Sequence, residues 1–114
     1  MKIEKFEDIV TWQKSRDLTL QIYAIFKSSK DYSFKDQIQR ASVSIMNNIA
    51  EGFERKSNKE LMHFLYIAKG SCGEVRSMLL LGKELKYINS DEYVKLNNLA
   101  LEISRMLFGF IKTL

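Results

Sequence analysis

The chain has 114 residues, no proline, five glycines and a hydrophobic fraction of 46%. This length fits one domain over residues 1–114, and the hydrophobic fraction excludes a disordered chain. The lack of proline favours long helices, because proline removes a helical hydrogen-bond donor. A formal net charge of +4 is compatible with a nucleic-acid partner but does not require one.

The first helix is predicted over residues 8–27. Side chains that suit a buried helix face recur there at intervals of three and four: Trp12, Ser15, Leu18, Ile22 and Phe26. A polar break over residues 28–31 ends this helix. The second helix is predicted over residues 34–54, with Ser33 and Asp36 resembling a capping box. Its buried stripe is predicted to contain Ile38, Ala41, Ile45 and Ile49.

The third helix, over residues 58–86, has the clearest predicted start, because Ser57 and Glu60 form an S-x-x-E capping box. Its apolar stripe contains Leu61, Phe64 or Leu65, Ala68, Cys72, Val75, Leu79 and Gly82. The fourth helix is predicted over residues 91–113, with Ser90 as its cap. Its stripe contains Tyr93, Leu96, Leu99 or Ala100, Ile103, Leu107 and Phe110.

Four helices joined by short connections run antiparallel in turn, so the sequence predicts an all-α, up-down-up-down four-helix bundle. Its apolar residues exceed what one bundle core needs. The run Met78–Leu81 is wholly apolar, and Phe108, Phe110 and Ile111 crowd the last turns. Consecutive residues point around a helix, so part of each group must face outward. We expect these outward faces to be contacts between copies of the chain; scattered exposed apolar residues are the alternative.

Cys72 is the only cysteine, so no disulfide can form within the chain, which fits a reducing compartment. It lies on the apolar stripe of the third helix, where cysteine behaves as a small hydrophobic residue. The opening residues contain no signal-peptide core, and no apolar run is long enough to span a membrane. We therefore expect a cytoplasmic protein without a membrane partner.

Glu60 and His63 have the Glu-x-x-His spacing that helical di-metal sites use. A complete site needs two such motifs, and His63 is the only histidine. A metal-dependent enzyme would therefore require separate copies of the chain to converge, and this remains a remote alternative. No glycine-rich phosphate loop or paired nucleophile and base is present, so we predict neither an enzyme nor a cofactor.

Polar residues form a second stripe on the second predicted helix, and the third helix offers Ser71 and Glu74. The stripe contains Arg40, Ser44, Asn48, Glu51 and Arg55. Such groups beside an apolar face could form an active site. The alternative is a hydrogen-bonded network that fixes the register of helices or subunits, and we favour it because no activated base accompanies them.

Basic residues gather at the connection between the second and third helices, where Arg55, Lys56 and Lys59 are close in sequence. Lys35 and Arg40 add positive charge to the second helix. If several copies present these residues on one rim, their charges would sum into a surface that attracts phosphate. For one isolated copy, a solvated turn is the simpler interpretation.

Four stretches also stand in a recognisable order: residues 6–14 (FEDIVTWQK), 37–41 (QIQRA), 45–52 (IMNNIAEG) and 64–71 (FLYIAKGS), the last followed by Glu74. Together they resemble the ribosomal RNA intervening-sequence proteins, a bacterial family. The connection at residues 28–33 departs from the family pattern because it lacks a proline.

This resemblance implies a four-helix bundle that assembles as a ring-like homopentamer. It also relates the chain to the accessory protein of diversity-generating retroelements, which partners a reverse transcriptase and binds nucleic acid through a basic surface. The family-type residues carry no catalytic role; in this chain they are Arg40, Asn48, Glu51, Gly52, Ser71 and Glu74.

The sequence and the resemblance lead to one main functional hypothesis. It is a non-enzymatic homo-oligomer that binds structured RNA or DNA, or a nucleoprotein, by electrostatic attraction. Arg55, Lys56 and Lys59 are the expected phosphate contacts, followed by Lys35 and Arg40. The alternative is a scaffold that binds another protein and has no role with nucleic acid.

Overall fold

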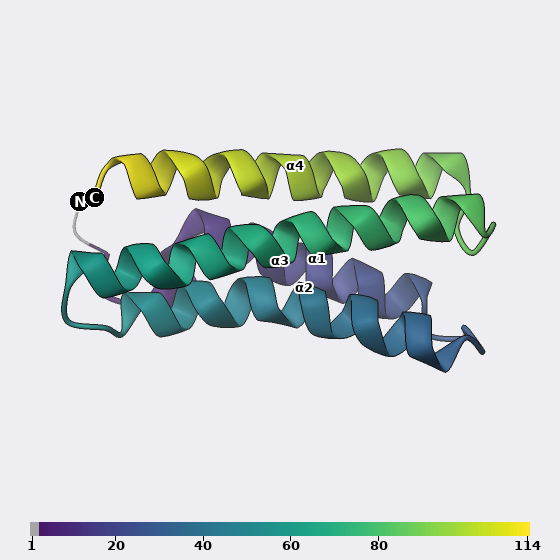
Figure 1. Ribbon diagram of the computed structural model, residues 1–114, viewed down its shortest axis with the longest axis horizontal. Helices are drawn as coiled ribbons and strands as arrows, with labels where there is room; N and C mark the ends of the chain where they lie inside the picture. Colours follow the sequence, from purple (N-terminus) through teal and green to yellow (C-terminus); the bar gives the residue numbers. More distant parts are fainter. Residues whose placement is uncertain (1–2) are drawn as a thin grey trace.

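The computed structural model describes residues 3–114. Within that range a short 3-10 helix, η1 (Phe6–Asp8), precedes the α-helices α1 (Val10–Ile25), α2 (Tyr32–Phe53), α3 (Asn58–Glu84) and α4 (Ser90–Lys112). The α-helices lie alongside one another, and their connections alternate between the two ends of the molecule (Figure 1). Each packs against two neighbours, in the order α1, α2, α3, α4 and back to α1. The predicted all-α four-helix bundle is confirmed.

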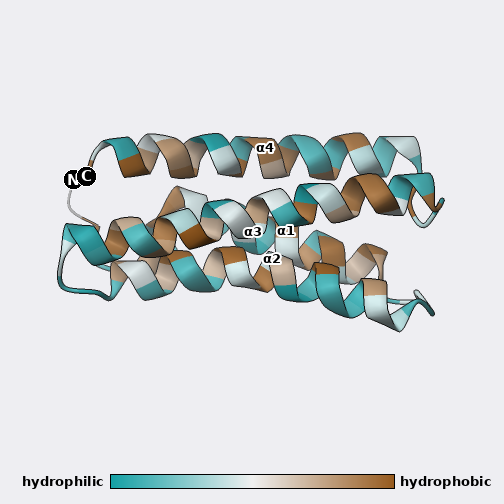
Figure 2. Ribbon diagram, in the orientation of Figure 1, coloured by the Kyte–Doolittle hydropathy of each residue, from teal (hydrophilic) through white to brown (hydrophobic). Residues whose placement is uncertain are grey.

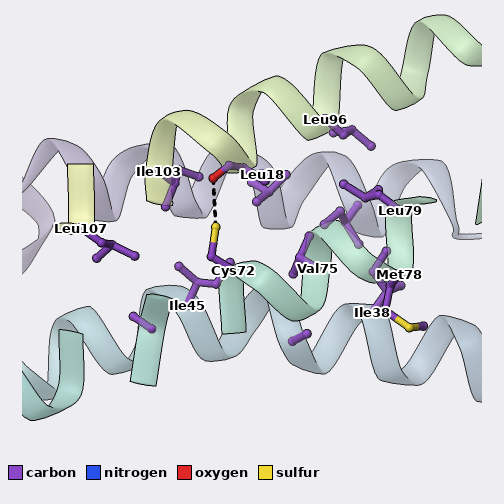
Figure 3. Close-up of a cluster of buried hydrophobic side chains, with 14 of the residues drawn as sticks. Leu18, Ile38, Ile45, Cys72, Val75, Met78, Leu79, Leu96, Ile103 and Leu107 are labelled. Carbon is purple, nitrogen blue, oxygen red and sulfur yellow. Dashed lines mark hydrogen bonds between the residues drawn. The ribbon is translucent and has the colours of Figure 1, made fainter. Parts of the chain in front are cut away.

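The core contains one apolar stripe from each helix. Hydrophobic and hydrophilic residues therefore alternate in short bands along every ribbon (Figure 2). The side chains that meet in the centre of the bundle include Leu18, Ile38, Ile45, Leu79 and Leu107, all fully buried (Figure 3). Gly82 belongs to the α3 stripe because Phe34 packs over it; a Cβ atom there would lie 2.9 Å from Cζ of Phe34.

Helix boundaries differ most from prediction at α1, which was expected to begin at residue 8. Residues 6–8 instead form η1, and Ile9 follows in an extended conformation (φ −77°, ψ 119°) with its side chain 3% exposed. Ile9 is the extended N-cap residue of α1, so the α-helix begins only at Val10. The helix also ends at Ile25 rather than at residue 27.

Two predicted helix caps were wrong by one or two residues. The N-cap of α2 is Asp31, whose carboxylate accepts a hydrogen bond from the N–H of Phe34 at 3.1 Å; Ser33 lies inside the helix. The N-cap of α4 is Asn89 rather than Ser90. Its side chain and that of Glu92 form a reciprocal capping box.

Ser57 caps α3 as predicted, accepting a hydrogen bond from the N–H of Glu60 at 3.1 Å. The reciprocal hydrogen bond of the predicted capping box, from the Ser57 backbone N–H to the Glu60 carboxylate, does not form. The Glu60 carboxylate accepts a hydrogen bond from the Ser57 hydroxyl at 3.3 Å instead of from the Ser57 backbone. The other carboxylate oxygen of Glu60 pairs with the Arg55 guanidinium at 3.8 Å.

The apolar run near the end of α3 points both inward and outward, as expected for consecutive helical residues. Met78 and Leu79 are buried in the core, whereas Leu80 and Leu81 are each 45% exposed. Leu85, one turn further on, is 46% exposed. We call Leu80, Leu81 and Leu85 the leucine patch. On α4 the corresponding outward side chain is Phe108, which is 47% exposed.

Candidate functional site

The turn between α2 and α3, residues 54–57, is held tightly against α3. A Cβ atom at Gly52 would lie 2.9 Å from Cβ of Phe64 and 3.0 Å from Cδ1 of Leu61. A larger residue at position 52 would push the two helices apart. Glycine therefore brings the cations of the turn close to the first turns of α3.

Arg55 is fixed by three neighbours. Its guanidinium lies 3.6 Å from the carboxylate of Glu51, 3.8 Å from that of Glu60 and 4.7 Å from the ring centroid of Phe64. These partly exposed ion pairs are individually weak, but two carboxylates offset most of the positive charge. Arg55 therefore shapes the surface more than it adds free charge.

Arg55 and Phe64 line a groove of about 580 Å³ together with Lys59, Glu60 and His63, which we call the turn groove. The His63 ring packs edge-on against Phe64, with 5.4 Å between ring centroids. Lys59 and its neighbour Lys56 are exposed, and neither forms an ion pair within residues 3–114. Free ammonium groups beside aromatic rings are suited to contact phosphates and nearby bases.

The other two predicted phosphate contacts lie away from this groove. Lys35 is in the first turn of α2, about 30 Å along that helix from the turn groove. Its ammonium donates to the carbonyl of Lys27, just after α1, at 2.9 Å. Arg40 pairs with Asp36 at 2.9 Å. The structure thus brings together Arg55, Lys56 and Lys59 and separates Lys35 and Arg40 from them.

A short polar chain connects α2 to α3 near the middle of the bundle. The hydroxyls of Ser44 and Ser71 lie 2.8 Å apart. The Asn48 amide nitrogen donates to the Ser44 carbonyl at 2.8 Å and to the Ser44 hydroxyl at 3.0 Å. These bonds hold the Asn48 amide in one orientation and join two helices.

The remaining family-type residues do not join this chain. Glu74 accepts a hydrogen bond from Gln37 at 3.5 Å, and Arg40 pairs within its own helix. Glu51 pairs with Arg55, and Gly52 acts through its small size. Of the six family-type residues, Arg40, Asn48 and Glu51 line one groove on α2, whereas Gly52, Ser71 and Glu74 do not.

Glu60 and His63 lie side by side in the turn groove, but Glu60 is occupied by Arg55 and Ser57. Within residues 3–114, no three side chains of the histidine, cysteine or acidic types come together as a metal site would require. One copy of the chain therefore offers only a fraction of the ligands that the metal alternative needs.

Cys72 lies in the core between α3 and α4, where its thiol donates to the carbonyl of Ala100 at 3.0 Å (Figure 3). Burial raises the pKa of the thiol to about 11, although the charges of Arg76 and Lys69 act in the opposite direction. A thiol with this pKa is almost entirely protonated at neutral pH and is a poor nucleophile. This agrees with its interpretation as a small core residue.

The model of the 23S rRNA-intervening sequence protein family matches residues 7–109. The chain belongs to this family. The match covers the turn groove, the Ser44–Ser71 chain and most of the bundle. Neither the family description nor the similar solved structure below specifies an enzymatic activity.

A solved structure from Bacteroides thetaiotaomicron, a protein of unknown function from the S23 ribosomal protein family, has the same fold. It shares 28% sequence identity with this chain, with a TM-score of 0.84. The alignment covers 90% of this chain and 98% of that one. Comparison with curated proteins gives no match. Within residues 3–114 of this chain, none of the helices combines the length and the apolar character needed to cross a membrane.

Sequence reasoning missed two features of the site. It identified the cations of the turn but did not place Phe64 and His63 beside them, although one helical turn separates Lys59 from His63 and would have allowed it. It also placed Ser44 on the polar stripe and favoured a hydrogen-bonded network there, but it did not pair the Ser44 hydroxyl with that of Ser71.

Proposed function

We propose that this protein is a non-enzymatic, cytoplasmic homo-oligomer that binds structured RNA or DNA through its α2–α3 turns. The observation that carries this proposal is the turn groove, where Lys59 lies beside Phe64 and His63. Lys56 is exposed on the adjoining turn, and neither lysine has an ion-pair partner within the described residues. Membership of the 23S rRNA-intervening sequence protein family supports the same function.

Assembly is needed to make this surface effective. Arg55 pairs with Glu51 and Glu60, and the exposed Glu54 partly offsets Lys56 and Lys59, so one turn alone carries little net positive charge. Several copies arranged in a ring would place many such lysines on one rim, and their combined potential would attract a phosphate backbone. A pentamer is the assembly that we propose, with the leucine patch and the outward face of α4 as the subunit contacts.

The salt dependence of binding tests this function. The experiment measures fluorescence polarisation of a labelled RNA hairpin and a DNA duplex over a series of salt concentrations. Affinity should fall steeply as salt rises. Combined Lys56→Gln and Lys59→Gln substitution should weaken binding and lower the slope of log K against log salt by about 2 for each subunit engaged with DNA.

Lys30→Gln provides the control, because Lys30 is an exposed lysine in the α1–α2 connection, outside the turn groove and outside the proposed subunit contacts. This variant should bind with nearly the affinity of the unmodified protein. Absence of binding to either nucleic acid at low salt would exclude the proposed function. Equal losses in the control and in the double variant would instead exclude the turn groove as the contact surface.

A further inference from the structure

A second groove lies on the outer face of α2 and differs in character from the turn groove. It has a volume of about 470 Å³, and Tyr23 of α1 lines it together with residues of α2. The register of the two helices is fixed where the Thr19 hydroxyl donates to the carbonyl of Ser42 at 3.2 Å. This feature is an open groove rather than an enclosed pocket.

The aromatic side of this groove is Tyr23, which is 43% exposed. Its hydroxyl makes no hydrogen bond to residues 3–114, and its ring takes part in no aromatic pair with them. The core of the bundle therefore does not account for the position of Tyr23. An exposed ring of this kind provides a flat surface on which a planar group can stack.

Two neighbouring amides supply hydrogen-bonding groups to the same groove. Asn48 is oriented by its bonds to Ser44, which leave its side-chain oxygen without a donor among the described residues. Asn47 is exposed, and its amide has no hydrogen-bond partner within residues 3–114. The Asn47 amide presents a donor and an acceptor side by side, the pattern that matches the edge of adenine, whereas Asn48 offers only its oxygen as an acceptor because its amide nitrogen donates to Ser44.

The charges around the groove cancel, and this distinguishes its ligand from a phosphate. Arg40 pairs with Asp36 at 2.9 Å, and Glu51 pairs with Arg55 at 3.6 Å. With one cation and one carboxylate in the lining, each already paired, the groove attracts a phosphate weakly. A neutral planar group that offers hydrogen-bond donors and acceptors is a better fit.

We propose that this groove binds one unpaired nucleobase, with adenine preferred. Tyr23 stacks on the face of the base, while Asn47 and Asn48 bind its edge. The base must be unpaired, because only then are both its face and its edge accessible. This proposal rests on the proposed nucleic-acid function and adds to it a preference for loops and bulges over regular duplex.

Two labelled RNA hairpins with the same stem test the proposal, one with an adenine loop and one with a uracil loop. The same pair made as DNA shows whether the sugar matters. The adenine loop should bind more tightly than the uracil loop by roughly tenfold. Tyr23→Ala and Asn47→Leu should each remove that preference, and both should bind a blunt duplex with unchanged affinity.

Tyr32→Ala is the matched control, because Tyr32 is 70% exposed at the start of α2 and does not line the groove. It should keep the adenine preference. Circular dichroism shows whether each variant remains folded. Equal binding of the two loops by the unmodified protein, or a preference that survives both groove substitutions, would overturn the proposal.

Titration with adenosine separates this proposal from the electrostatic function, because adenosine carries no phosphate. Side-chain amide NMR signals of Asn47 and Asn48 should shift with adenosine and much less with uridine. The Lys56→Gln and Lys59→Gln variant should respond identically. Absence of shifts at millimolar adenosine would overturn the base site while leaving binding through the turn groove intact.

Discussion

Lys86 has a backbone conformation that is unusual for its residue type. Its φ is 63°, and within residues 3–114 no other non-glycine residue has a positive φ. The N–H of Lys86 donates to the carbonyl of Lys83 at 3.0 Å, and that of Tyr87 donates to the carbonyl of Gly82 at 2.8 Å. These two bonds are the Schellman motif, in which glycine usually occupies the left-handed position. Lys86 therefore strains the end of α3.

Lys86→Gly should consequently stabilise the protein. Relief of the left-handed strain outweighs the added freedom of the unfolded chain, giving a net gain of about 0.5–1 kcal/mol in the free energy of unfolding. Urea denaturation followed by circular dichroism measures this change. Lys95→Gly, inside α4, should instead destabilise by about 1 kcal/mol. A loss of stability in Lys86→Gly would show that the turn does not carry the strain.

At the scale of the helices, Asp31 joins two connections that are distant in sequence. Its carboxylate caps α2 through Phe34 and accepts a hydrogen bond from the Tyr87 hydroxyl at 2.7 Å. The Tyr87 bond, followed by the Phe34 bond, holds the pKa of Asp31 below its ordinary value of 3.8. One carboxylate thus ties the α1–α2 connection to the α3–α4 connection.

Asp31→Ala should lower the melting temperature at neutral pH. Because folding lowers the pKa of Asp31, its stabilising contribution is complete above the ordinary value and is lost as pH falls through the lowered one. The difference in melting temperature between the two proteins should therefore shrink in strong acid. An unchanged difference would contradict this account.

Tyr87→Phe isolates the hydroxyl, since the ring remains against Phe34, 5.1 Å away between centroids. In this variant the pKa of Asp31, followed by carboxyl NMR, should return toward its ordinary value. It should not return fully, because the bond from the N–H of Phe34 remains.

The helices could be predicted from sequence because periodicity reports which face is buried. The capping residues were harder to predict. Asp31 and Ser33 are both good capping residues, and the second partner of Asp31, the Tyr87 hydroxyl, lies far along the chain where local patterns do not reveal it. Ile9, the extended N-cap of α1, is likewise buried by tertiary contacts that local propensity does not contain. Local patterns gave the type of each element, and tertiary contacts decided its ends.

Site prediction had the same limit. The cations at the α2–α3 connection are neighbours in sequence, so their proximity was predictable. The neutralisation of Arg55 involves Glu51, Glu60 and the ring of Phe64 at once, and depends on how closely Gly52 lets the helices approach. Lys35 was included for its charge alone, and the fold places it at the other end of α2.

For the molecule as a whole, the leucine patch is an apolar surface that the core of one copy does not use. Three leucines exposed by 45–46% near the end of α3 favour contact with another apolar surface. Combined Leu80→Ser and Leu81→Ser substitution should reduce the mass measured by light scattering toward that of one chain. Nuclease treatment beforehand removes any contribution from bound nucleic acid.

Leu20→Ser serves as the control for that experiment, because Leu20 is 62% exposed on α1, outside the proposed contacts. It should leave the measured mass unchanged. If the unmodified protein already has the mass of one chain, the proposed assembly is wrong. If the leucine variant keeps the full mass, the contacts lie elsewhere.

The position of the last residues has a practical consequence for how the protein is purified. The end of α4 lies at the same end of the bundle as the α2–α3 turn (Figure 1). A polyhistidine tag joined after Leu114 would therefore begin at the end of the bundle that carries the α2–α3 turn (Figure 1). It would add metal ligands and positive charge to that end of the molecule. Binding and metal content should accordingly be measured only after such a tag has been removed.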